Sequence, residues 1–106
     1  MIMDEGIKTI RDIIVKTVPI EKLYLFGSYA YGNPNKDSDY DFYMVMPNNT
    51  LMRPLDAITE VYMAMGQMKR KSVDLLANTQ ERFDKRSKQI TLEREVATKG
   101  VLLYEQ

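Results

Sequence analysis

Apolar residues recur along this chain at helical spacing in some segments and in short unbroken runs in others. Between residues 4 and 18, apolar residues recur every three or four positions, which predicts an amphipathic helix capped by Asp4. Further helices are expected as one turn at 28–31, a longer helix after 48–50 and two short helices within 80–99. The buried stripe predicted for the longer helix is Leu55, Ile58, Tyr62, Met65 and Met68.

The unbroken apolar runs are short and predict strands. They lie at 23–26, 40–46, 72–77 and 101–104. Helices that alternate with strands predict an α/β (α+β) fold of two layers, a mixed sheet of about four strands with helices packed on one face. No repeat or linker divides the sequence, so we expect residues 1–106 to form a single domain.

Composition narrows the kinds of chemistry that this sequence supports. The 15 basic and 15 acidic residues balance, so no global field attracts nucleic acid, and we expect no direct nucleic-acid binding. The lack of cysteine and histidine excludes disulfides and the Ser-His-Asp triad, which leaves carboxylates as the available bases. We expect a cytoplasmic protein without membrane contact, because the sequence has neither a signal peptide nor an apolar run of ~20 residues.

Three aspartates lie where strands make carboxylates costly. Asp39 and Asp41 are two positions apart at the start of a predicted strand, so they project from the same face. Two charges ~4 Å apart repel by about 4 kcal/mol at an effective dielectric of ~20, unless one is protonated or a cation lies between them. Asp74 interrupts another apolar run and completes a three-carboxylate cluster if the two strands are neighbours. Magnesium fits such a cluster, because it binds a few carboxylates and keeps positions for water and phosphate.

A Gly-Ser pair at the end of the first strand is a candidate phosphate site. Gly27 lets backbone N–H groups approach a ligand closely, and Ser28 begins the following helical turn and adds a hydroxyl donor. Lys36 lies in the loop that follows, where it could reach a phosphate. Two tyrosines of the turn, Tyr29 and Tyr31, are candidates to line a nucleotide site.

Two other motifs share part of this pattern, and so does a plain turn. Gly27 and Gly32 have the spacing of a P-loop, but the Lys-Ser or Lys-Thr that must follow is absent. The alternating aspartates match the opening of an EF-hand loop, but Phe42 and Asn48 replace its glycine and its final glutamate. A solvated turn explains the aspartates within 37–39 and leaves the aspartate of the later strand unexplained.

Together these residues resemble the minimal nucleotidyltransferases of the DNA polymerase β superfamily. That family is characterised by a Gly-Ser pair, ten residues, an Asp-x-Asp pair and a third acidic residue on a later strand. The matching positions here are Gly27, Ser28, Asp39, Asp41 and Asp74, and Gly32 and Ser38 also agree. The helix–strand order and the length extend the resemblance over most of the chain.

The resemblance implies the transfer of a nucleoside monophosphate from a triphosphate, usually AMP from ATP, to a hydroxyl group. Asp39 and Asp41 would hold two magnesium ions, and Asp74 would share one and help to deprotonate the acceptor. Gly27 and Ser28 would bind the terminal phosphates. No covalent enzyme intermediate is required, because positioning and electrostatics suffice.

The acceptor is expected to be another protein. Larger relatives, such as the aminoglycoside adenylyltransferases, carry a further domain that binds the acceptor, and this sequence shows none. Stand-alone domains of this size resemble antitoxins that neutralise HEPN-domain ribonuclease toxins by adding AMP to a toxin tyrosine, so we expect a HEPN toxin as the partner. Two alternatives stay open, an antitoxin that acts by contact alone and an adenylyltransferase of small molecules. A homodimer also stays open.

Overall fold

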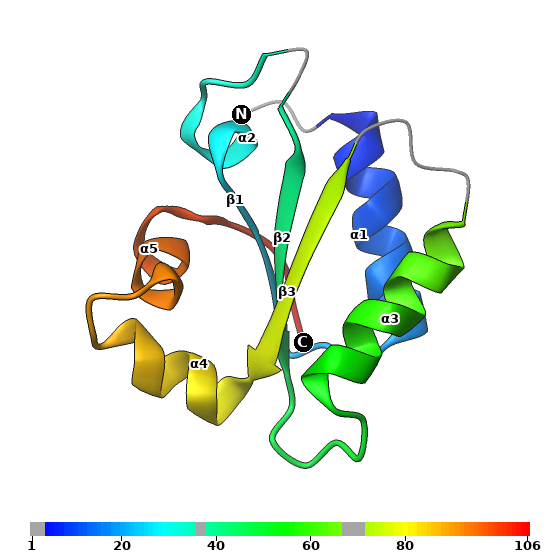
Figure 1. Ribbon diagram of the computed structural model, residues 1–106, viewed down its shortest axis with the longest axis vertical. Coiled ribbons are helices and arrows are strands. Elements are labelled where there is room, and N and C mark those ends of the chain that lie inside the picture. Colours follow the sequence, from blue (N-terminus) through cyan, green and yellow to red (C-terminus); the bar gives the residue numbers. More distant parts are fainter. Residues whose placement is uncertain (1–3, 36–37, 67–71) are drawn as a thin grey trace.

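The helices and strands follow the order that the apolar pattern predicts (Figure 1). The computed structural model describes residues 4–35, 38–66 and 72–106. The elements are α1 (Glu5–Thr17), β1 (Lys22–Phe26), α2 (Ser28–Tyr31), β2 (Tyr40–Met46), α3 (Pro54–Met65), β3 (Val73–Thr79), α4 (Gln80–Ser87), α5 (Leu92–Lys99) and β4 (Val101–Glu105). The expected helices and strands are therefore confirmed, with ends that differ by a few residues.

The four strands form one mixed sheet in the order β3-β2-β1-β4. β1 is antiparallel to both β2 and β4, whereas β2 and β3 run parallel. A parallel pair needs a crossover connection, and α3 supplies it between β2 and β3. This crossover makes the aspartate strands neighbours, as the three-carboxylate cluster requires. The predicted α+β fold with a four-stranded mixed sheet is confirmed.

α1 and α3 cover one face of the sheet and enclose the larger part of the core (Figure 1). α3 buries Ala57, Val61 and Met65. The stripe predicted from the sequence is right for Met65 and in part for Ile58, which is half-buried. It is wrong for Leu55 and Tyr62, whose exposed fractions are 69% and 36%. Apolar residues lie on more than one side of this helix, so packing and not spacing selects the buried side. Met68 lies outside the described residues.

α4 and α5 lie on the opposite face, so helices cover both sides of the sheet and not one side as expected (Figure 1). Phe83 of α4 and Val96 of α5 pack on Tyr43 and Val45 of β2. β2 is therefore buried on both faces along its length, and Asp41 is its one residue that is not fully buried. An unbroken apolar strand such as β2 is typical of a sheet covered on both sides.

A polar contact joins the start of α1 to the start of β2. Asp4 caps α1 as predicted, because its Oδ1 accepts a hydrogen bond of 2.7 Å from the Gly6 N–H. Burial and a hydrogen bond to Asp4 raise the pKa of Tyr40 to about 12. This hydrogen bond links the N-cap of α1 to the strand end that precedes Asp41. None of the helices built from described residues is long and apolar enough to cross a membrane.

Candidate active site

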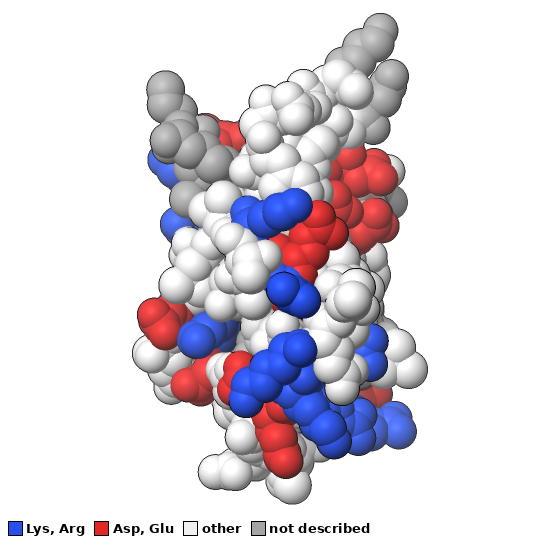
Figure 2. Space-filling view, turned by 90° about the vertical axis from the view of Figure 1, so that its left-hand side faces the viewer, with Lys and Arg blue, Asp and Glu red and all other residues white. Residues whose placement is uncertain are grey.

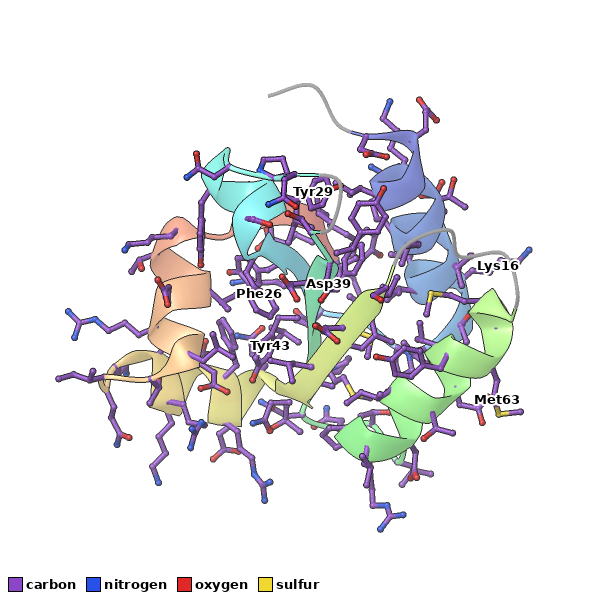
Figure 3. The ribbon with its side chains drawn as sticks, turned by 45° about the horizontal axis from the view of Figure 1, so that its top comes forward. Lys16, Phe26, Tyr29, Asp39, Tyr43 and Met63 are labelled. Atoms are coloured by element: carbon purple, nitrogen blue, oxygen red, sulfur yellow. The ribbon has the colours of Figure 1, made fainter. Side chains whose placement is uncertain are left out.

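The strand register brings Asp41 and Asp74 side by side. They are Cα partners across the parallel pair β2–β3, near the start of both strands. Asp39 lies two residues before Asp41, just ahead of β2, with its side chain exposed (Figure 3). Side chains at alternate positions share a face, so Asp39, Asp41 and the buried Tyr43 belong to the face that α4 and α5 cover. The carboxylates lie at the open end of that face.

The carboxyl group of Asp41 is the most perturbed member of this cluster. Burial, the close contact with Asp74 and the negative charges of Asp74 and Asp39 raise its pKa from 3.8 to about 6. The ion pairs formed between described residues involve none of these three aspartates. The negative charge is thus uncompensated within the described ranges, as expected for a site that binds a cation.

These donors suit a hard divalent ion. Carboxylate oxygens are the ligands that magnesium prefers, and the raised pKa of Asp41 is what crowded carboxylates show without a cation between them. In the described parts of the chain, however, no three acidic side chains are already arranged as a set of metal ligands. Asp41 and Asp74 are adjacent, and Asp39 acts on Asp41 through its charge. Their assignment as metal ligands stays a prediction.

The structure shows a reason for glycine at position 27 that was not apparent from the sequence. It follows β1 directly, and Phe26 is the Cα partner of Asp41 across the β1–β2 pair. Its φ of 74° belongs to a region that L side chains avoid. A Cβ atom at this position would overlap Oδ2 of Asp41. Gly27 therefore makes room for the carboxylate, in addition to the close ligand approach that we expected of it.

Ser28 begins α2, a single turn that ends at the left-handed Gly32. The first N–H groups of a helix have no partner within it, and in α2 the first of them belongs to Ser28, which directly follows the glycine packed against Asp41. The Ser28 side chain is half-buried. This arrangement agrees with the predicted phosphate site and does not test it.

The two tyrosines of α2 are placed differently. Tyr29 packs against Tyr40, with ring centroids 4.8 Å apart, on the side of α1. Tyr31 is more exposed and contacts the backbone of Gly27. Burial and the charges of Glu95 and Asp41 raise the pKa of Tyr31. Of the two candidates, Tyr31 is therefore the one whose hydroxyl is influenced by the charge of Asp41.

One residue predicted to contribute to the site cannot be placed. Lys36, expected to reach a phosphate, lies outside the described residues. The position of its side chain therefore adds nothing to the geometry of the site, and its role stays a prediction.

A buried polar network beneath the aspartates escaped the sequence analysis. The hydroxyl of Tyr43 donates a hydrogen bond of 2.8 Å to Oε2 of Glu93, and Arg86 Nε donates one of 3.0 Å to Oε1. Burial alone would raise the pKa of Glu93, but hydrogen bonds from Tyr43, from the backbone and from Arg86, with the charge of Arg86, outweigh it and lower the pKa. Alternation along β2 places Tyr43 on the face of Asp41, which was a usable signal. No pattern in the sequence singled out Glu93.

Comparison with known proteins agrees with this geometry. A sequence profile of the family described as "Polymerase beta, Nucleotidyltransferase" matches residues 8–106, nearly the whole chain. No curated protein is significantly similar to the chain in sequence.

Two solved structures share the fold. One is a protein of Sulfolobus solfataricus, provisionally assigned as a nucleotidyltransferase, with a TM-score of 0.66 and 22% identity over 96% of this chain and 79% of that chain. The other is a toxin–antitoxin with AMP-PNP, with a TM-score of 0.61 and 22% identity over 93% of this chain and 73% of that chain. At such identity the likeness concerns the fold alone.

Proposed function

This chain belongs to the polymerase β nucleotidyltransferase family, and we propose that it transfers AMP from ATP to a hydroxyl group of a partner protein in a magnesium-dependent reaction. The observation that carries the proposal is the pairing of Asp41 with Asp74 directly against Gly27. A carboxylate pair and a Gly-Ser turn in contact provide for a metal and for a phosphate chain at one place.

Each residue then has a distinct task. Asp39 and Asp41 hold the metal, and Asp74 orients the acceptor hydroxyl and receives its proton. The N–H groups at Ser28 and the turn, with Lys36, bind the terminal phosphates. Two bound magnesium ions would neutralise the triphosphate and the departing pyrophosphate. The acceptor oxygen bonds to the α-phosphorus, the bond to the β-phosphate breaks, and pyrophosphate leaves.

We further propose that the acceptor is a tyrosine of a HEPN-domain toxin and that the chain is its cytoplasmic antitoxin. The fold likeness to a toxin–antitoxin with AMP-PNP supports this choice, because that structure contains the same fold together with a toxin–antitoxin pair and an ATP analogue. Family membership supports nucleotidyl transfer more strongly than it supports any particular acceptor.

The test is a labelling reaction with purified components. The chain, the candidate toxin, magnesium and ATP labelled at the α-phosphate are expected to give label on the toxin, and mass spectrometry should locate it on a tyrosine. The double variant Asp39→Asn with Asp41→Asn is expected to lower the rate by at least about a thousandfold, since it removes the metal-binding charge. Asp12→Asn is the matched control, because Asp12 is an exposed aspartate of α1.

Two results would contradict the proposal. Absence of transfer to any protein, with any of the four common triphosphates, would remove the enzymatic function. Full neutralisation of the toxin in cells by the Asp39→Asn, Asp41→Asn variant would show that contact alone suffices. In that case any labelling of the toxin by the wild-type protein would be a secondary activity.

A further inference from the structure

A cluster of cationic side chains lies on the same face of the sheet as the aspartates, beyond the other end of β3. It surrounds a cavity of about 500 Å³. We call this cavity the α4 pocket. Its lining residues are Asn78, Arg82, Lys85, Arg86, Gln89 and Glu93. The transfer chemistry described above uses none of them.

Hydrogen bonds to a buried glutamate hold part of the lining of the α4 pocket in place. Glu93, with an exposed fraction of 8%, receives hydrogen bonds from Tyr43 and from Arg86. Tyr43 is itself fully buried, so Arg86 is fixed through Glu93 to the centre of the sheet. A cation anchored in this way loses little further side-chain freedom when it binds a ligand.

The α4 pocket carries an excess of positive charge. Its described lining residues comprise three cations, Arg82, Lys85 and Arg86, and one carboxylate, which gives them a net charge of +2. Glu93 is already occupied by Arg86 and Tyr43. Within the described ranges, neither Arg82 nor Lys85 forms an ion pair. Figure 2 shows basic side chains gathered in the lower part of this side of the molecule, at the level of α4, with acidic side chains both among them and above them.

β3 connects the α4 pocket to the aspartates. Asp74, Leu76 and Asn78 alternate along the strand and share one face. At a rise of about 3.3 Å per residue, Asp74 and Asn78 are ~13 Å apart. Leu76 lies between them with an exposed fraction of 36%. Along this line the surface presents a carboxylate, then an apolar side chain, then cations.

We propose that the α4 pocket binds an acidic side chain of the acceptor protein and so selects the hydroxyl that enters the active site. This inference rests on the proposed function. In an extended segment the ~13 Å between Asp74 and Asn78 corresponds to about four residues. The recognised sequence therefore has its acidic residue about four positions from the modified residue, with an apolar residue between them over Leu76.

The composition of the α4 pocket favours a peptide over a nucleic acid. None of the described residues that line it is aromatic, whereas single-stranded nucleic acids are commonly bound by stacking on aromatic rings. Glu81 and Asp84 belong to the same helix as the cations and would repel a continuous chain of phosphates. A single carboxylate group matches a compact cationic pocket better than a polyanion does.

The test uses synthetic peptides with one tyrosine and one glutamate placed two, four or six residues away on either side, each with a glutamine counterpart. Binding is measured by fluorescence anisotropy without ATP or metal, and AMP transfer is measured separately as kcat and KM. Wild-type protein is expected to prefer glutamate about four residues away by roughly tenfold in Kd and KM, with kcat little changed. Arg82→Glu with Lys85→Glu should abolish that preference and favour the matching lysine peptide.

Lys8→Glu with Lys16→Glu makes the same change in charge on α1 and should leave the preference intact; Figure 3 shows Lys16 on the far side of the sheet from α4. Arg82→Gln with Lys85→Gln serves if the reversed charges disturb folding. Equal binding of glutamate and glutamine peptides by the wild type would overturn the inference. So would a single-stranded RNA that outcompetes the glutamate peptide in wild type but not in the Arg82, Lys85 variant.

The two measurements separate this inference from the proposed function. Glutamate-dependent binding without AMP transfer would support the α4 pocket and contradict the enzymatic proposal. Transfer to peptides regardless of the glutamate would support the enzymatic proposal and contradict the α4 pocket.

Discussion

The two faces of the sheet are built from the same strands and differ in what they bury. The face under α1 and α3 holds a continuous apolar cluster to which β1, β2 and β3 all contribute. The face under α4 and α5 has a small apolar cluster, and around it lie the aspartates, a buried glutamate and the cationic α4 pocket. Neighbouring residues of β2 therefore lie in different environments, one apolar and the other partly polar and charged.

This division separates stability from chemistry. The apolar face can supply most of the hydrophobic free energy, because each buried side chain there removes apolar area from water. The other face can then hold groups that destabilise the fold in the absence of a ligand, such as the paired Asp41 and Asp74. Substitutions on the two faces should therefore differ in their effects on the free energy of unfolding and on AMP transfer.

The sharpest comparison is between Phe42 and Asp41, which are adjacent in β2 and point to opposite faces. Phe42 is fully buried, so Phe42→Ala should lower the free energy of unfolding by ~3–5 kcal/mol. Asp41→Asn should leave that free energy unchanged or slightly higher, because it removes a repulsion, while AMP transfer is lost. Urea unfolding followed by circular dichroism measures the first effect, and labelling measures the second.

Leu55→Ala is the control for this comparison, because it truncates an exposed apolar residue and should change stability by less than about 0.5 kcal/mol. If Asp41→Asn destabilised the protein as much as Phe42→Ala, the carboxylate face would be a structural core like the other face.

Gly27 and Gly32 allow the close approach at the active site to be separated from backbone strain. Both have positive φ, but a Cβ at Gly32 meets no atom within 4 Å, whereas one at Gly27 overlaps Asp41. Gly32→Ala should therefore cost only the strain, about 1 kcal/mol. Gly27→Ala adds the clash and should cost ~1–3 kcal/mol and reduce AMP transfer at least tenfold by displacing the carboxylate.

Thermal unfolding and kinetics of the two variants measure these effects. Equal loss of activity in both glycine variants would mean that α2 itself, and not the contact with Asp41, governs the site.

The order of helices and strands was predictable because local signals determine it. Apolar runs bounded by glycine, proline and asparagine are short-range features, and they gave each strand of the sheet to within a few residues. The three aspartates were predictable as candidates for a similar reason, since carboxylates are rare within apolar strands. Whether they lie side by side depended on the strand order, which could not be derived from the sequence. The cluster could therefore be predicted only on the assumption that the two strands are neighbours.

The remaining features depend on long-range contacts. Tyr43 and Glu93 are 50 residues apart in sequence, so neither indicates the other. The clash that Gly27 avoids arises across the β1–β2 pair and requires the register. The cover of α4 and α5 over the second face could have been inferred from the unbroken apolar run of β2. The buried side of α3 could not, because several of its sides are apolar.

The smallest predicted effect is the pH dependence that Asp41 gives to the metal-free protein. Its pKa is raised in the folded state, from 3.8 to about 6, so the folded protein binds this proton more tightly than the unfolded chain does. The resulting stabilisation is complete at pH values below the pKa of the unfolded chain, 3.8, and is lost as the pH rises through the folded pKa of about 6. After allowance for solvent screening of a half-buried group, the loss should be about 1 kcal/mol. Magnesium should abolish the loss, because the ion replaces the proton between the carboxylates.

The measurement is urea unfolding from pH 4.5 to 7.5, with EDTA or magnesium, expressed as the difference between wild type and Asp41→Asn. That subtraction removes the contributions of other groups, including Glu93, whose lowered pKa acts in the opposite direction. A difference that stays constant across this range in EDTA would show that Asp41 is not under the electrostatic stress that marks this face of the sheet.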